Sequence, residues 1–205
     1  MENKTEFSQD EIEAFKELGN VGAGHAAIAL SKLFNKEVDM SVPFIRVGDV
    51  ETIISGINLK TDEVVGFTAT EVIKPLRYKL SVIFKEKTIL SLLELLSSTT
   101  RTEIKSEDDL SDMQKSLVQE IGSTIILRYV AALNKMLKVE SLPELAPIFK
   151  LETARIAIKD SGYQESANLI FIQLDLFTDE LKFECHLLIQ PHPASLEGYR
   201  KAFFL

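Results

Sequence analysis

The stretches "KELGNVGAGHAAIALSKL" (residues 16–33) and "QEIGSTIILRYVAALNKM" (residues 119–136) align without a gap, at an offset of 103 positions. Matching residues recur along both; the aligned pairs include Glu17 with Glu120, Leu18 with Ile121, Gly19 with Gly122, Asn20 with Ser123 and Leu30 with Leu133. Self-similarity at a fixed offset indicates a structural unit that occurs twice. We therefore predict a single domain, residues 1–205, built from repeats over residues 8–98 and 111–203 that a polar linker joins.

Each repeat is predicted to run helix, three strands, helix. Capping boxes at residues 8–11 and 111–114 open helices that extend to about residues 34 and 137. The remaining predicted elements are strands over residues 38–50, 64–72 and 78–84, a helix over 86–98, strands over 148–158, 169–177 and 181–190, and a helix over 194–203. The predicted fold class is α/β of the α+β type, with two long helices packed on an antiparallel sheet of about six strands.

The bulk composition fits a cytoplasmic globular protein. With 45% hydrophobic residues and 26% charged residues, the chain can bury a sizeable core. A net charge of −8 argues against nucleic acid or an anionic membrane surface as a partner. Cys185 is the one cysteine, which excludes an internal disulfide and suits a reducing compartment. We expect no membrane insertion, because no apolar run approaches the length of a spanning helix, and we favour a monomer.

Three glycines interrupt the first predicted helix. Residues 22–27 fit the dinucleotide-binding pattern G-x-G-x-x-A, and Asp39 follows where a ribose contact could be sought. That loop needs a buried strand before it, whereas here helical spacing precedes the glycines, so nucleotide binding is disfavoured. Glycine inside a helix costs about 1 kcal/mol relative to alanine. Gly22 is explained by close packing on the predicted core stripe, which comprises Phe15, Leu18, Gly22, Ala26, Ala29 and Leu33.

A polar stripe lies opposite that core stripe. It is formed by residues that project within about 40° of one direction, namely Glu13, Glu17, Asn20, Gly24 and Ser31. Such a face is most often only solvated. The unexplained glycine at position 24 and the repeat of the motif at Glu120 and Ser123 favour a contact surface instead. His25 lies off the stripe, on its flank.

The residues of this stripe carry a resemblance. Residues 16–43 resemble the signature of the CheC family of chemotaxis phosphatases, relatives of CheX and FliY. The family pattern is Asp or Ser, three residues, Glu, two residues, Asn, twenty-two residues, Pro. Glu17, Asn20 and Pro43 match it, and Glu13 stands where Asp or Ser is usual.

The second repeat departs from the pattern. Ser116 and Glu120 fit, but Ser123 replaces the asparagine and Leu127 occupies the place of Gly24. The prolines at 143 and 147 are three positions early and one position late. We therefore expect Glu120 and Ser123 to form a degenerate second site.

The resemblance implies an enzyme that removes the phosphoryl group from phosphorylated CheY, the chemotaxis response regulator. It implies that Asn20 holds the attacking water, that Glu17 docks by pairing with a regulator lysine, and that Glu13 and Gly24 contact the partner. Phosphoryl transfer depends mostly on positioning and charge stabilisation, and the regulator brings its own Mg²⁺, so the chain needs no metal or cofactor.

Two alternatives have other functions. The family also binds CheD, a receptor-modifying deamidase, so a weakly active chain could serve as an adaptor. Residues 7–15, "FSQDEIEAF", are similar to the regulator-binding peptide of the flagellar switch proteins FliM and FliY. Here that segment runs straight into the first helix, and the chain ends without the further C-terminal domain of those proteins, so a motor role is disfavoured.

Overall fold

The computed structural model describes residues 7–56, 59–60, 62–97, 103–144, 147–160 and 169–204. Its helices are α1 (Gln9–Phe34), α2 (Val50–Gly56), α3 (Glu86–Ser97), α4 (Asp112–Leu137), α5 (Ala154–Asp160) and α6 (Leu196–Phe204). Its strands are β1 (Asp39–Met40), β2 (Phe44–Gly48), β3 (Val64–Val72), β4 (Tyr78–Lys85), β5 (Ile148–Thr153), β6 (Leu169–Phe177) and β7 (Lys182–Pro191). Short 3₁₀ turns cover Glu107–Asp109 and Pro193–Ser195.

All strands of the described residues join one antiparallel sheet in which strands of the two predicted repeats alternate in part. The strand order is β1-β6-β7-β4-β3-β5, and β2 also pairs with β6. Strand β2 of the first predicted repeat pairs with β6 of the second. Strand β5 of the second predicted repeat pairs with β3 of the first. The last strands, β4 and β7, pair at the centre. The predicted fold class is therefore confirmed.

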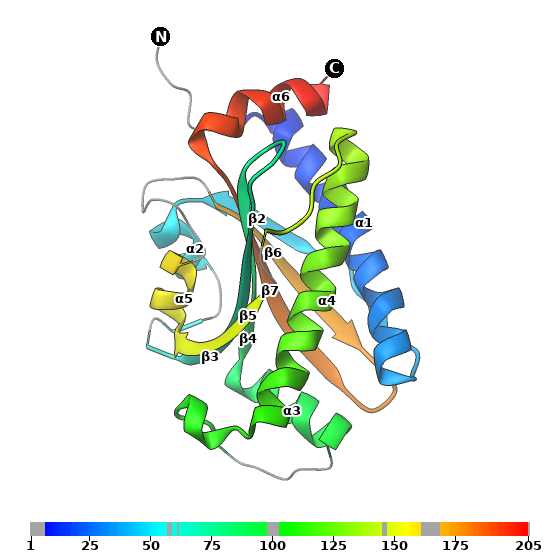
Figure 1. The fold of residues 1–205 in the computed structure, drawn as a ribbon, viewed down its shortest axis with the longest axis vertical. Helices are drawn as coiled ribbons and strands as arrows, with labels where there is room; N and C mark the ends of the chain where they lie inside the picture. Colours follow the sequence, from blue (N-terminus) through cyan, green and yellow to red (C-terminus); the bar gives the residue numbers. More distant parts are fainter. Residues whose placement is uncertain are drawn as a thin grey trace.

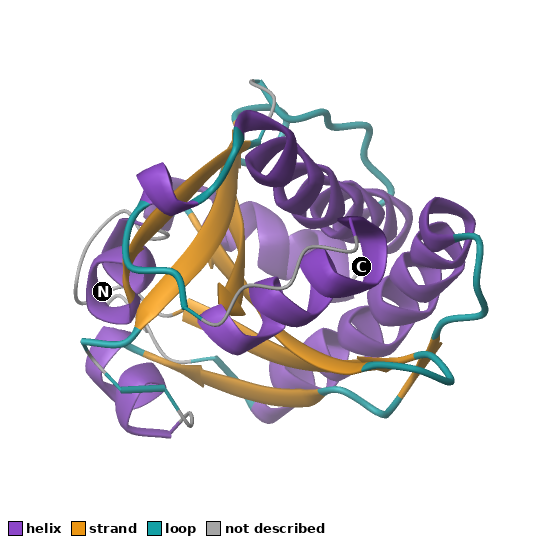
Figure 2. Ribbon diagram, turned by 90° about the horizontal axis from the view of Figure 1, so that it is seen from below, coloured by secondary structure: helices purple, strands orange, loops and turns teal. Residues whose placement is uncertain are grey.

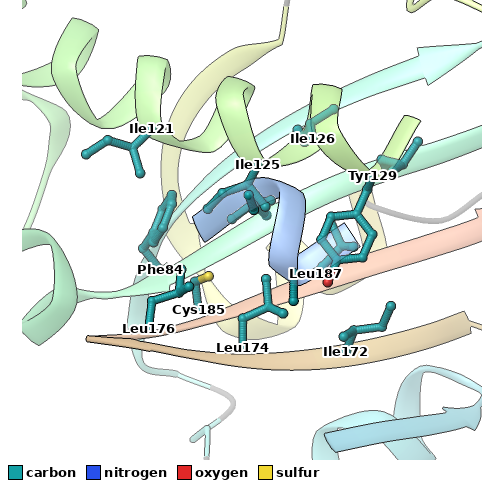
Figure 3. Packing of buried hydrophobic residues seen from close by; sticks show 14 of the residues in the cluster. Phe84, Ile121, Ile125, Ile126, Tyr129, Ile172, Leu174, Leu176, Cys185 and Leu187 are labelled. Carbon is teal, nitrogen blue, oxygen red and sulfur yellow. The ribbon is translucent and has the colours of Figure 1, made fainter. Parts of the chain in front are cut away.

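The two long helices cover one face of this sheet. Helices α1 and α4 lie side by side in Figure 1, and α3 and α6 close the two ends. The sheet passes between this layer and the short helices α2 and α5 (Figure 2). The larger core lies under α1 and α4, where Ile121, Ile125 and Tyr129 of α4 meet Phe84, Cys185 and Leu187 of the sheet (Figure 3).

Helix starts were predictable because both capping boxes form. The Ser8 hydroxyl accepts from the backbone amide of Glu11, and the Ser111 hydroxyl accepts from that of Gln114. These contacts satisfy amide groups that lack a partner within the first turn. Both helices end in a left-handed residue, at Asn35 and Lys138. The predicted linker begins at residues 98–102, which lie outside the described residues, and the division into two repeats stays a prediction.

The strands predicted over residues 38–50 and 148–158 are wrong in part. The chain leaves the sheet earlier than predicted, and helices α2 and α5 occupy its place at the same point of both repeats. A short apolar run has no reliable period, although Asp49 offered a start signal for α2, because its carboxylate accepts from the Thr52 amide at 2.7 Å.

The two missed helices change the environment of β7. Apolar residues alternate with polar ones along this strand, from Phe183, Cys185 and Leu187 to Glu184, His186 and Gln190, a pattern that predicts one buried face and one open face. Ile53, Ala157 and Leu188 instead form part of a second core under α2 and α5. As a result His186 and Gln190, on the face predicted to be open, are buried as completely as Cys185 on the other.

Candidate functional site

Helix α1 carries the candidate site and is fixed at its start by α6. The Arg200 Nε donates to Glu11 Oε1 at 2.8 Å, and the Glu11 side chain is nearly buried. Burial is the largest influence and by itself raises the pKa of Glu11, but hydrogen bonds from Ser8 and Arg200 together lower the pKa below its usual value. Phe7 packs edge-on against Phe15, with ring centroids 5.0 Å apart. The segment that is similar to the switch-protein peptide, residues 7–15, therefore forms the start of α1.

Two of the glycines in α1 are required by internal packing. A Cβ on Gly22 would lie 2.4 Å from the Tyr129 ring of α4, and a Cβ on Gly19 would lie 2.7 Å from Ile45 of β2. The Tyr129 hydroxyl donates to the Gly19 carbonyl at 3.0 Å. Burial raises the pKa of Tyr129 well above its ordinary value, so this hydroxyl keeps its proton. The packing prediction for Gly22 is confirmed.

Gly24 differs from these two glycines. A Cβ built on it would meet nothing within 4 Å, so no contact inside the described chain requires a glycine there. Glu17 and Asn20 precede it on the same face, and both are exposed. Neither side chain has a hydrogen-bond or ion-pair partner among the described residues. The three residues thus leave a carboxylate, a carboxamide and a bare stretch of backbone open to another molecule.

The residues at the two ends of the predicted stripe, Glu13 and Ser31, form hydrogen bonds within the chain. Glu13 Oε1 accepts from Lys16 Nζ at 2.6 Å and from Gln9 at 3.2 Å, and the Lys16 hydrogen bond lowers the pKa of Glu13. The Ser31 hydroxyl donates to the Ala27 carbonyl at 2.8 Å and accepts from the Val38 amide at 3.0 Å. Ser31 therefore fixes the turn after α1.

The turn after α1 explains the position of Pro43. Pro43 comes directly before β2, a place that suits a residue with no amide to donate to a ladder. Strand β2 then runs along β6 and brings Ile45 over Gly19. The proline of the motif therefore stands at the entry to the strand that packs against α1 at Gly19.

One exposed residue of the same face was missed from the sequence. Ile28 is 61% exposed and lies one turn after Gly24. It lines a groove of about 560 Å³ with Ser31, Lys32, Asn35, Lys36 and Glu37. The helical period puts Ile28 within about 40° of Gly24, so the signal was present, but the prediction considered only polar residues and glycine there.

Helix α4 presents the corresponding face of the second repeat. Glu120 is exposed, and Ser123 is half-buried. Leu127, at the place of Gly24, is 45% exposed and stands out from the surface. Gly122 packs onto the sheet, where a Cβ would lie 2.6 Å from the Thr68 hydroxyl. The second stripe therefore exists, but it lacks both the carboxamide and the bare backbone of the first.

A polar cluster on the far face of the sheet lies apart from both stripes. His186 Nε2 and Lys85 Nζ lie 2.9 and 2.8 Å from Glu184 Oε1. The hydrogen bond from His186 and then that from Lys85 lower the pKa of Glu184 to about 2, against the effect of burial. In the described ranges, no three histidine, cysteine or carboxylate side chains gather to hold a metal ion, and no helix there is long and apolar enough to cross a membrane.

Comparison with known proteins agrees with this geometry. The model of the CheC-like family matches residues 13–46, a range that spans the α1 stripe and Pro43. CheC of Bacillus subtilis (strain 168), named a CheY-P phosphatase, is 22% identical over 200 residues, which are 93% of this chain and 92% of that protein.

Solved structures share the fold over nearly the whole chain. FliY of Thermotoga maritima matches with a TM-score of 0.73 at 15% identity, over 96% of this chain and 97% of the other. A chain of the FliG–FliM complex from H. pylori matches with a TM-score of 0.71 at 11% identity, over 95% and 100%. The chain is thus similar to the CheC-like family in the part that carries the motif, and similar to CheC over nearly its full length.

Proposed function

We propose that the protein is a phosphatase that hydrolyses the aspartyl phosphate of a CheY-type response regulator at the α1 stripe. The observation that carries the proposal is the outer face of α1, where Glu17 and Asn20 are exposed without partners beside the bare backbone of Gly24. The similarity to a CheY-P phosphatase from Bacillus subtilis supports the same reaction and substrate.

In the proposed reaction, water attacks the phosphorus and the bond between phosphorus and the aspartate oxygen breaks. The products are inorganic phosphate and a free aspartate carboxylate, and the proton of the water leaves with phosphate or to solvent. A carboxamide can both accept from and donate to one water molecule. Asn20 therefore holds the water in line with the leaving oxygen, the kind of positioning on which phosphoryl transfer depends.

Glu17 has a different role in this proposal. It lies one turn before Asn20 on the same face, where its carboxylate can pair with a lysine of the regulator and fix the register of docking. Glu13 is already paired with Lys16, so it contributes at the edge of the contact. Mg²⁺ belongs to the regulator, and this chain supplies no metal or cofactor of its own.

The test is the decay of a phosphorylated CheY-type regulator with and without the protein. Asn20→Ala should reduce the acceleration by about two orders of magnitude, the scale for losing one positioning contact in the transition state. Ser123→Ala, the equivalent change in α4, serves as the matched control and should have little effect. Full activity in a folded Asn20→Ala protein would exclude the mechanism.

CheD as a partner rests on the family resemblance alone, and adding CheD to the same assay tests it. A change in rate that depends on CheD concentration would establish an adaptor role beside the phosphatase activity. We place the reaction in the cytoplasm, because a chain with one cysteine, Cys185, forms no internal disulfide and suits a reducing compartment.

A further inference from the structure

We propose that Ile28 sets regulator specificity by inserting into an apolar depression on the regulator, beside the phosphorylated aspartate. The inference rests on the proposed function, because it takes the α1 stripe as the face that docks. It adds a recognition contact that acts on binding rather than on hydrolysis.

The position of Ile28 puts it inside any such contact. Eight residues separate it from Asn20, which is about 12 Å along a helix axis. A specific protein interface covers roughly 800 Å² on each partner, a patch about 30 Å across. A regulator centred on Asn20 therefore reaches Ile28, and it lies against the helix closely at Gly24, where no side chain intervenes.

The shape of the surface around Ile28 supports a specific contact. A single exposed apolar residue is common on proteins, so its 61% exposure does not suffice. Ile28, however, projects between bare Gly24 on one side and the groove beyond Ser31 on the other. Helical side chains lean toward the N-terminus, so Ile28 borders the bare patch, and β-branching leaves it one dominant rotamer. Such a side chain loses little entropy on docking.

The net charge of the chain bears on how much an apolar contact contributes to binding. The protein carries a net charge of −8, and the surface it must approach carries an anionic phosphoryl group. Attraction between this chain and the phosphoryl group therefore cannot supply the affinity, whereas burial of apolar surface can supply part of it.

Helix α4 shows the contrary arrangement. The position equivalent to Ile28 is Ala131, and the position equivalent to Gly24 is Leu127. On α1 the exposed apolar side chain, Ile28, lies one turn after Gly24. On α4 the exposed apolar side chain, Leu127, stands at the position equivalent to Gly24. A regulator surface that accommodates Ile28 would collide with Leu127, so the contact distinguishes the two faces.

The experiment measures dephosphorylation against regulator concentration for the full chain. Ile28→Ala should raise KM roughly tenfold, the scale of one lost apolar side-chain contact, and leave kcat within about twofold. Ile28→Leu should restore most of the affinity. Leu127→Ala is the control, because it removes similar apolar surface from α4 and should change neither constant. An unchanged KM for Ile28→Ala, or an equal rise for Leu127→Ala, would overturn the inference.

Direct binding separates this inference from the proposed function. Titration with the regulator carrying beryllofluoride, a stable phosphoryl mimic, measures docking without hydrolysis. If the wild type binds but does not accelerate decay, the phosphatase proposal fails, while a tenfold weaker Kd for Ile28→Ala still supports the contact. If the wild type does not bind, or Ile28→Ala binds equally well, the contact is refuted.

Discussion

Helices α1 and α4 occupy equivalent places in the two predicted repeats, yet the middle parts of their buried faces differ in side-chain size. Among the aligned pairs that are buried in both helices, four join a small residue of α1 to a large residue of α4: Gly22 with Ile125, Ala23 with Ile126, Ala26 with Tyr129, and Ala27 with Val130. Every α1 member is glycine or alanine, and every α4 member is large. The Tyr129 ring of α4 fills the space against Gly22 of α1. The two helices can therefore approach closely here only because the α1 residue is small. The two helices are thus complementary in side-chain size at these four positions.

The outer faces of the two helices also differ in side-chain size, but for another reason. There α1 has glycine at position 24, where α4 has Leu127. Small residues on the inner face of α1 serve packing, whereas the small residue on its outer face has no neighbour within the described chain. Comparing the two helices therefore separates glycines that the fold needs from the one that points to a partner.

The largest expected effect comes from removing the side chain that joins the helices. Tyr129→Ala should lower the free energy of unfolding by about 3–5 kcal/mol, the range for deleting a buried aromatic ring. Tyr129→Phe, which loses only the hydrogen bond to Gly19, should cost about 1 kcal/mol. Urea unfolding followed by circular dichroism measures both. A loss below 1 kcal/mol for Tyr129→Ala would mean that this ring does not hold the helices together.

A pair of glycine substitutions tests the distinction within α1. Gly22→Ala should destabilise by about 1–3 kcal/mol, because the new Cβ has to displace the Tyr129 ring. Gly24→Ala should stabilise by up to about 1 kcal/mol through helix propensity alone. The same change at two positions in one helix therefore gives opposite signs in thermal or urea unfolding. Equal signs would refute our division of the glycines.

Several features of the fold and of the α1 face could be predicted from the sequence, because they depend on residues that are close together in the chain. Capping boxes predicted the starts of α1 and α4, and the strands predicted over residues 64–72 and 169–177 are β3 and β6 as observed. Gly24 and Asn20 were correctly assigned to the outer face of α1. The CheC-like motif, once noticed, pointed to the same turn.

Features that depend on tertiary contacts could not be predicted in this way. The contact of Gly22 with Tyr129 joins residues far apart in the chain, and no period in the sequence reports it. The buried stripe of α1 was placed slightly off centre, since Ala23, Ala27 and Leu30 are more buried than the predicted Ala29 and Leu33. Small residues dominate that face, so hydrophobic periodicity defines its direction weakly.

The smallest expected effect comes from rebuilding the α4 stripe. Ser123→Asn with Leu127→Gly supplies the missing carboxamide and bare backbone beside Glu120. In the wild-type background the phosphatase rate should rise by at most about twofold, as expected for a second equivalent site. In the Asn20→Ala background, where the first site is inactive, the double change should restore measurable activity. No recovery in a folded protein would show that the α4 face lacks more than these two residues.

The most direct test of the central claim compares the two docking glutamates, because both repeats retain one. Glu17→Ala and Glu120→Ala each remove one exposed carboxylate, so neither should disturb the fold, which circular dichroism and unfolding verify. Turnover of a phosphorylated CheY-type regulator is then measured side by side for the two variants and the wild type. Our account predicts that Glu17→Ala loses most of the activity and Glu120→Ala loses little. Greater damage from Glu120→Ala would contradict it, because the working site would then lie on α4.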